Sequence, residues 1–206
     1  MRLILLSDTH GLHDCLSVPD GDILIHAGDI TMSGTLSELE LFDHFLSQQP
    51  HRHKIVIAGN HDSCLESNPR EARERIKHGV YLQDAGIEID GIKFWGTPWQ
   101  PWFMDMAFNV ASNIGRRARW SLIPSDTQVL ITHTPPRSIL DLTSLGENVG
   151  CEELARVVKT LGLRLHVFGH IHEAYGIRAI GETTYINACT SNLQYQPIQP
   201  PIVFDL

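Results

Sequence analysis

The chain has 206 residues, enough to bury a substantial core, and its 42% hydrophobic and 19% charged residues are ordinary for a globular protein. A formal net charge of −8 argues against a broad nucleic-acid-binding surface and leaves small anionic substrates open. Twelve histidines are many for this length, which is a first indication of metal chemistry.

Targeting and redox signals are weak. The opening apolar run, Leu3 to Leu6, is too short for a signal peptide or a membrane span, so no membrane association is expected. The four cysteines lie far apart and form no CxxC pair. This spacing favours reduced thiols in a cytoplasmic protein over a disulfide framework.

Five apolar runs of strand length recur along the chain, and each leads into a polar cluster. Continuous apolar runs predict strands that are covered on both faces, as in sheets flanked by helices. The runs are RLILL (2–6), DILIH (22–26), KIVIA (54–58), QVLIT (128–132) and RLHVF (164–168).

Helices are predicted between these runs. Residues 34–49 carry apolar residues at helical spacing, and Thr35 and Glu38 fit a capping box. Two further helices are expected at 69–79, starting with Pro69 and stopping at Gly79, and at 151–162, closing on Gly162.

The remaining strand signals are antiparallel. Residues 87–95 alternate around Asp90-Gly91, which predicts a tight hairpin. Residues 176–188 and 202–206 also have the pattern of antiparallel strands. The order of elements predicts an α/β fold with two α/β halves in one domain, since no linker or repeat separates them.

Polar residues collect where the predicted strands end, which is where open α/β sheets place their sites. In HVFGHIHEAYG, two histidines one residue apart follow an apolar run, and side chains at that spacing on a strand share a side. The candidate metal ligands collected in this way are Asp8, His10, Asp29, Asn60, His133, His170 and His172.

Seven donors are too many for one metal ion and suit two. Two divalent ions close together need a shared anion to offset their repulsion, and the Asp29 carboxylate can bridge them. Two carboxylates against about +4 leave about +2, enough to hold a hydroxide and attract a phosphate. A nitrogen and oxygen set without thiolate suits Mn²⁺ first, and also Fe or Zn²⁺.

Five motifs in one order carry a family resemblance. D-x-H, GD, GNHD, H-x-P and GHIH, between Asp8 and His172, resemble the calcineurin-like metallophosphoesterase superfamily. GTPWQPWF, THTPP, GCEEL, TTYINA and PPIVFDL are most similar to the subfamily of metallophosphoesterase domain-containing proteins 1 and 2. The resemblance covers nearly the whole chain.

The resemblance implies a fold and a ligand set. The implied fold is α/β (α+β, four layers), with two mixed β-sheets packed as a sandwich flanked by helices, in one domain spanning residues 1–206. The first ion would be held by Asp8, His10, Asp29 and His172. The second would be held by Asp29, Asn60, His133 and His170.

The resemblance also implies a reaction. A metal-bridging hydroxide would attack phosphorus in line, and His61 would be the catalytic acid that protonates the departing oxygen. The expected substrate contacts are Asn60, His61 and Arg137, and Asp62 is expected to orient the His61 ring.

One departure from the superfamily narrows the substrate. Protein phosphatases of this superfamily carry GDxVDRG, whereas this chain reads GDITMSG, with Met32 in place of the orienting aspartate. This departure argues against phosphoproteins, and the subfamily points to small phosphodiesters, including cyclic nucleotides. The leading hypothesis is therefore a binuclear, metal-dependent phosphodiesterase.

Several alternatives remain open. A metal-dependent nuclease, a phosphomonoesterase and a non-catalytic nucleotide-binding scaffold would share most of these motifs. A small phosphodiester or nucleotide is the expected partner, stable nucleic-acid binding is not expected, and the chain is a monomer or a homodimer. Trp95, Trp99, Trp102 and Phe103 either wall a substrate pocket or pack between the two halves, and the three arginines of GRRAR either form a solvated helix face or steer phosphate.

Overall fold

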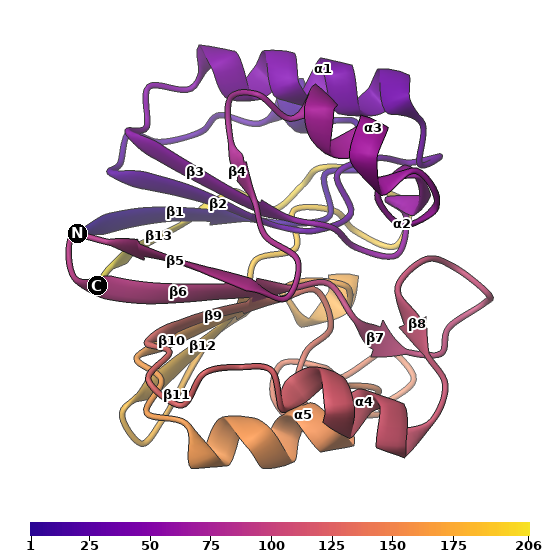
Figure 1. Cartoon of the computed structure of the whole chain (residues 1–206), viewed down its shortest axis with the longest axis vertical. Coiled ribbons are helices and arrows are strands. Elements are labelled where there is room, and N and C mark those ends of the chain that lie inside the picture. The colour runs from indigo at the N-terminus through magenta and orange to yellow at the C-terminus, as the bar shows by residue number, and fades with distance from the viewer.

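The computed structural model describes all 206 residues, and two β-sheets lie face to face between two layers of helices (Figure 1). The first sheet has a parallel core with one antiparallel edge strand. Its order is β13 (Ile202–Asp205), β1 (Arg2–Leu6), β2 (Ile23–Ala27), β3 (His53–Ile57) and β4 (Val80–Tyr81), with β13 the antiparallel strand.

The second sheet is also mixed. Its four inner strands are parallel, and both edge strands run antiparallel to their neighbours. Its order is β11 (Gly176–Ile180), β12 (Thr183–Asn187), β10 (Leu165–Phe168), β9 (Val129–Thr132), β6 (Ile92–Thr97) and β5 (Ala85–Ile89). A separate short pair is formed by β7 (Gln100–Pro101) and β8 (Asn109–Val110).

Helices cover the outer faces of both sheets. The first sheet is covered by α1 (Leu36–Gln48), α2 (Ser63–Ser67) and α3 (Pro69–Arg75), and the second by α4 (Asn113–Trp120) and α5 (Glu152–Val157). Three single turns of 3₁₀ helix are η1 (His13–Cys15), η2 (Val158–Thr160) and η3 (His172–Ala174). The helices of the structure are all too short or too polar to cross a membrane.

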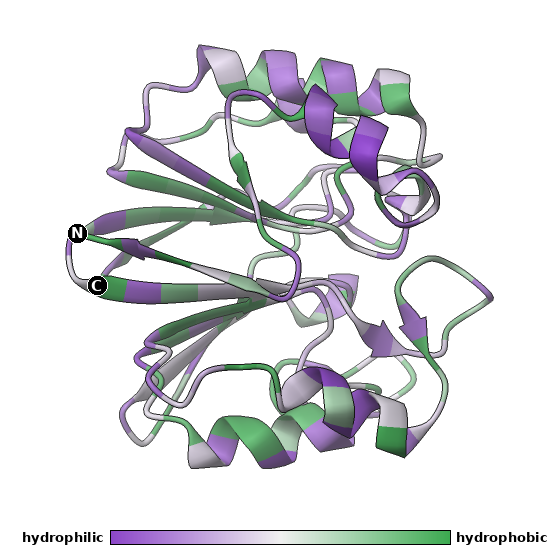
Figure 2. Ribbon diagram, in the orientation of Figure 1, coloured by the Kyte–Doolittle hydropathy of each residue, from purple (hydrophilic) through white to green (hydrophobic).

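Strand β1 shows why the runs are unbroken. Leu3 and Leu5 pack into the core between the two sheets, whereas Ile4 and Leu6 pack against the helices. All four side chains are fully buried, so both faces of the strand need apolar residues. Figure 2 shows that the strands contain long hydrophobic stretches, whereas hydrophobic and hydrophilic residues alternate along α1, which has one face exposed to solvent.

The predicted fold class is confirmed. The five apolar runs become β1, β2, β3, β9 and β10. At the hairpin between β5 and β6, Asp90 and Gly91 both have positive φ, as a type I′ turn requires. The Thr35–Glu38 capping box at the start of α1 is also present.

Two predicted helix ends are wrong. Helix α3 ends at Arg75 and not at Gly79, because Asp43 of α1 accepts hydrogen bonds from the Lys77 and His78 backbone N–H groups and draws the chain out of the helix. Helix α5 tightens into η2 and ends before Gly162, whose backbone is not left-handed.

Candidate metal centre

The seven predicted ligands lie on turns that follow five parallel strands, three in the first sheet and two in the second. Parallel strands of one sheet end at the same edge, so these turns meet there. The turns after β1, β2, β3, β9 and β10 carry, in that order, Asp8 and His10, Asp29, Asn60, His133, and His170 with His172. The structure brings all seven side chains into one cluster.

The backbone of these turns is strained. The φ angle is +56° at Asp8, +46° at His10, +54° at Asp29 and +68° at His170. Residues other than glycine are uncommon in this region, and each costs roughly 1–3 kcal/mol unless the surroundings hold it. The surroundings do so here, since the Asp8 N–H donates to the Gly28 carbonyl and the His10 N–H donates to the Asp29 carbonyl.

The Asp29 carboxylate lies between two groups of donors. Its Oδ2 atom is 3.9 Å from His10 Nε2, and its Oδ1 atom is 3.5 Å from His133 Nε2. The side chain is only 2% exposed. One oxygen therefore faces each group, which is the arrangement that a bridging carboxylate needs.

The first group contains Asp8, His10 and His172. His172 Nε2 is 3.4 Å from His10 Nε2 and 3.6 Å from Asp8 Oδ1. His172 Nδ1 donates to the Asn192 carbonyl, because a carbonyl oxygen can only accept. In the neutral ring, Nε2 then carries the lone pair, and two ring nitrogens facing each other across this distance suit a shared cation.

The second group contains Asn60, His133 and His170. His133 Nδ1 donates to the Ala27 carbonyl at 3.0 Å, and His133 Nε2 is 2.9 Å from Asn60 Oδ1. The His133 and His170 ring centroids are 5.0 Å apart. A backbone carbonyl thus fixes the orientation of one histidine in each group, as is usual for metal-binding histidines.

The charges of the cluster depend on one another. Burial opposes ionisation of Asp29, but the charge and hydrogen bond of His133 outweigh it and lower the Asp29 pKa. Burial opposes protonation of His133, but Asp29 and Asp8 raise its pKa to about 9. Burial and the His133 charge lower the His170 pKa to about 4, so this ring is neutral. In the metal-free protein, a proton on His133 thus supplies positive charge where a cation would.

Two glycines allow the donors to approach closely. A Cβ atom at Gly59 would lie 2.2 Å from Asp29 Oδ1 and 2.7 Å from His133 Cε1. At Gly169 a Cβ atom would lie 2.0 Å from Asp8 Oδ2. Neither glycine has a left-handed backbone, so the lack of space, and not the conformation, requires glycine here.

His61 lies beside the first group, with its ring centroid 4.6 Å from that of His10. Its Nδ1 atom donates to the Met32 carbonyl at 2.9 Å. The backbone of Met32 therefore does what a carboxylate side chain does in the protein phosphatase pattern. This leaves Nε2 as the ring atom available for proton transfer.

The prediction that Asp62 orients the His61 ring is wrong. Both Asp62 oxygens accept hydrogen bonds from the backbone N–H groups of Ile30, Thr31 and Gly59. Burial and the nearby Asp29 charge raise the Asp62 pKa to about 6 despite these bonds. Asp62 holds together the turns that follow β2 and β3.

A cavity of about 440 Å³ opens over the cluster. Its polar lining includes Asp29, Asn60, His61, His170 and His172, and its other walls include Trp102, Phe103, Val149, Leu193 and Tyr195. No lysine or arginine lines it. Arg137 is exposed, lies 3.8 Å from Glu152 and lines a separate surface depression, so its contact with substrate stays a prediction.

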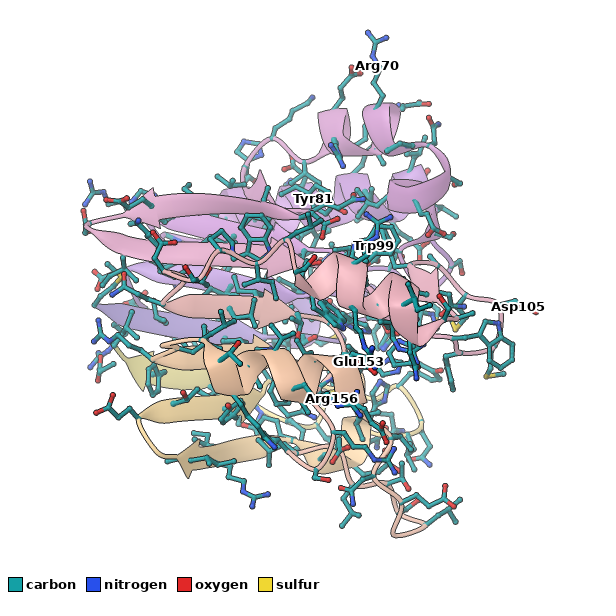
Figure 3. The ribbon with its side chains drawn as sticks, turned by 60° about the horizontal axis from the view of Figure 1, so that its bottom comes forward. Arg70, Tyr81, Trp99, Asp105, Glu153 and Arg156 are labelled. Atoms are coloured by element: carbon teal, nitrogen blue, oxygen red, sulfur yellow. The ribbon has the colours of Figure 1, made fainter.

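The aromatic residues divide between the two roles that the sequence left open. Trp102 and Phe103 line the cavity. Trp99 is half-buried, with the Arg119 guanidinium 3.8 Å from its ring centroid and Phe108 at its edge. In Figure 3 Trp99 lies beside α4, whereas Asp105 lies at the outer tip of the loop between β7 and β8.

The remaining tryptophan and the GRRAR arginines serve packing and local structure. Trp95 joins the apolar cluster between the second sheet and its helices. The Arg116, Arg117 and Arg119 side chains bind, respectively, the Val110 and Ala111 carbonyls, Glu153, and Asp84. None of the three lines the cavity, so phosphate steering is not supported.

Sequence reasoning missed the groups that support the cluster. The Ala27, Met32 and Asn192 carbonyls carry no residue signal, because every residue has a carbonyl. Tyr195 has edge-on contacts with the rings of His10, His61 and His172, and no motif marked it. It reaches the site only because β12 and the turn that follows return the chain to it, so no spacing rule could find it.

The donors fit divalent metal ions. Ligand atoms within 4.8 Å of one another occur in three sets: Asp8, His172 and Cys189; His10, Asp29 and His61; and Asp29, His133 and His170. In the metal-free protein, burial and then the charge of Asp8 raise the pKa of the Cys189 thiol, which donates its S–H to the Ser191 carbonyl. Nitrogen and oxygen donors of this kind suit Mn²⁺, Fe or Zn²⁺.

The site is thus a set of buried carboxylates and imidazoles at the strand ends of a sandwich of two mixed sheets, in groups that could hold metal ions. Residues 1–174 match the family model described as calcineurin-like phosphoesterase. The chain belongs to the calcineurin-like phosphoesterase family, whose members use divalent metal ions, and the predicted resemblance is confirmed.

Curated proteins of two animals are similar to this chain in sequence. Metallophosphoesterase domain-containing protein 1 of Homo sapiens is 40% identical over 230 residues, covering 100% of this chain and 71% of the relative. UPF0046 protein K07C11.7 of Caenorhabditis elegans is 35% identical, covering 99% of this chain and 74% of the relative.

Solved structures are similar in fold. One of them has a TM-score of 0.70 at 15% identity, and the match covers 94% of this chain and 91% of the chain in that structure. The structure of TT1561 from Thermus thermophilus has a TM-score of 0.60 at 16% identity, with 90% and 88% covered, and both structures support the fold alone.

Gly59→Ala is expected to abolish metal binding. The added methyl group would lie 2.2 Å from Asp29 Oδ1 and 2.4 Å from the Asp29 backbone nitrogen, so the residue that both donor groups share must move. Elemental analysis and circular dichroism of the purified variant check this. Gly162→Ala is the matched control, because nothing lies within 4 Å of its Cβ position. Metal content equal to the wild type in Gly59→Ala would contradict the shared role of Asp29.

Metal binding is expected to release protons. At pH 7 His133 is protonated in the metal-free protein, because its pKa is raised to about 9, and a ligating imidazole must be neutral. Affinity for Mn²⁺ should therefore fall as the pH falls below about 9, by about tenfold per pH unit for one proton. Calorimetry at pH 7 in two buffers of different ionisation enthalpy counts the protons, and equal heats in both buffers would refute the linkage.

Proposed function

We propose that this protein is a binuclear metal-dependent phosphodiesterase that acts on small phosphodiesters, cyclic nucleotides among them, with residues 1–206 as a single domain. The observation that carries the proposal is the buried Asp29 carboxylate, which turns one oxygen to each of two donor groups. The proposed ligands are Asp8, His10, Asp29 and His172 for one cation, and Asp29, Asn60, His133 and His170 for the other.

Two divalent ions, with Mn²⁺ our first choice, would supply a nucleophilic water and offset the negative charge of the phosphate. The side chains around them position the ester. Asn60 and His61 both line the cavity and are the proposed contacts to the phosphoryl oxygens. In-line attack then places the departing oxygen opposite the nucleophile, where it needs a proton.

His61 is the proposed donor of that proton. Its Nδ1–H is held by the Met32 carbonyl, so only Nε2 can exchange a proton with the substrate. The ring is partly exposed and lines the cavity, unlike the fully buried His133. A histidine held at one nitrogen and open at the other has the geometry of a general acid.

The charge of the cavity favours a diester over a monoester. A phosphomonoester is close to a dianion at neutral pH, whereas a diester carries one negative charge. Enzymes that bind more highly charged phosphates commonly add lysine or arginine, and none lines this cavity. Glu173, which does line it, opposes additional negative charge.

The cysteines and the proposed substrate also bear on the compartment and the partners of the protein. All four cysteines are free, which fits the reducing conditions of the cytoplasm, the compartment we propose. We expect a monomer or a homodimer that binds a small phosphodiester or nucleotide without stable binding to nucleic acid. A nuclease or a nucleotide-binding scaffold would be distinguished by the substrate screen that follows.

Hydrolysis of bis(p-nitrophenyl) phosphate by Mn²⁺-loaded protein tests the function. We expect turnover that stops when chelator removes the metal and returns on adding Mn²⁺, and a rate at least about tenfold above that with p-nitrophenyl phosphate. Cyclic nucleotides and single-stranded DNA are compared in parallel. A metal-loaded protein with no rate above the metal-free blank would refute the proposal, and tight nucleotide binding without turnover would favour the scaffold.

His61→Ala is expected to keep both metal ions and to lose turnover by about 10²–10⁴-fold, because it removes the proton donor and no proposed ligand. Metal content and kcat are measured on the same preparation. His44→Ala, an exposed histidine on α1, is the matched control. Loss of metal from His61→Ala would show that His61 is a ligand, as its place beside His10 and Asp29 also allows.

A further inference from the structure

Tyr195 has a place in the cavity that the proposed reaction does not use. Its ring meets the edges of three histidine rings, with centroids 4.8 Å from His10, 5.7 Å from His61 and 5.5 Å from His172. The side chain is 38% exposed, and it lines the cavity over the donor cluster. Its hydroxyl has no hydrogen-bond partner within the protein, so the ring contacts with the three histidines hold the side chain in the cavity wall.

The turn that carries Tyr195 is built to present it. Tyr195 has φ +58°, a strained conformation for a residue with a large side chain, and strain of this kind concentrates at functional sites. Asn192 holds the turn, because its side-chain oxygen accepts from the Gln194 and Gln196 N–H groups and its carbonyl accepts from the Tyr195 N–H. The same carbonyl also accepts the Nδ1–H of His172.

A second aromatic wall comes from a different segment. Trp102 and Phe103 line the same cavity and are 56% and 42% exposed. The Asn109 side chain binds both the N–H and the carbonyl of Phe103, and Asp105 accepts from the Trp102 indole N–H. Polar contacts therefore fix the Trp102 indole and the Phe103 backbone, and the Phe103 ring lies with its centroid 5.5 Å from that of His170.

Three partly exposed aromatic rings therefore line one cavity. Apolar surface that is contiguous and exposed to water often marks a ligand-binding site. The rings line the same cavity as Asn60 and His61, the proposed contacts to the phosphoryl oxygens. A flat, apolar or aromatic group would cover them, whereas a small aliphatic group would not.

We propose that Tyr195, together with Phe103 and Trp102, forms an aromatic clamp that selects phosphoesters carrying a flat aromatic group. This inference rests on the proposed function for its placement of the phosphate. Tyr195 is a specificity-determining residue that contacts the substrate through its ring. Stacking of one aromatic group on such a side chain is typically worth about tenfold in affinity or more.

The test compares the binding of phenylphosphonate and methylphosphonate to Mn²⁺-loaded protein by calorimetry. Neither probe has an ester bond to hydrolyse, and both bring the same phosphonate group, carrying a phenyl ring in one and a methyl group in the other. We expect the wild type to prefer phenylphosphonate by about tenfold or more. Tyr195→Ala should lose most of that preference and keep its affinity for methylphosphonate, and Tyr195→Phe should retain the preference.

Several outcomes would overturn the clamp. They are equal binding of the two probes by the wild type, an equal loss for both probes in Tyr195→Ala, and a loss in Tyr195→Phe as large as in Tyr195→Ala. The second outcome would indicate only a structural role through the turn that holds His172. Phe103→Ala tests the second aromatic wall and should also reduce the preference. Elemental analysis of each variant ensures that metal content is unchanged.

The design separates this inference from the proposed function, because binding is measured without turnover. If the wild type discriminates between the probes but hydrolyses no diester, the function fails and the clamp stands. If it hydrolyses diesters but does not discriminate, the function stands and the clamp fails.

Discussion

The buried carboxylate of Asp29 is the constraint on which the rest of the site depends. A carboxylate that is withdrawn from water is stable only if positive charge or hydrogen bonds replace its hydration. Here the His61 N–H donates to Oδ1 at 2.8 Å, and imidazoles approach both oxygens. The proton on His133 completes this compensation in the metal-free protein, because the negative charges of Asp29 and Asp8 raise the pKa of His133.

The same constraint connects the centre to the packing of the sandwich. Asp29 follows a strand of the first sheet, whereas His133 follows a strand of the second. Their side chains can meet only if the apolar faces of the two sheets pack in one register, as Leu5, Ile25 and Val167 do in the shared core. The geometry of the donor cluster and the burial of the core therefore depend on the same packing, and a change in sheet packing would separate the donors.

Much of the fold and of the donor set could be predicted from the sequence, because it depends on residues that are close together in the chain. The capping box of Thr35 depends on chain neighbours, and every ligand follows an apolar run. The end of α3 was not predicted, because hydrogen bonds to Asp43, from a different helix, decide where it stops. Asp62 was expected to touch His61 because it is the next residue, but its oxygens turn inward to the backbone of two turns. The carbonyl of Met32 takes that role, and a backbone group leaves no trace in residue identity.

The metal donors and the aromatic walls of the cavity are held by different parts of the structure, so they can change separately. Donors sit at the ends of buried strands, where the core holds them, whereas Trp102 and Tyr195 sit on exposed segments held by local polar contacts. The two parts touch at Asn192, whose carbonyl holds His172 and whose side chain shapes the turn of Tyr195. Because the contact to His172 uses only a backbone atom, side chains in this turn can vary without removing it. A centre of this construction can therefore keep its metal chemistry while the walls of the cavity change which ester it accepts.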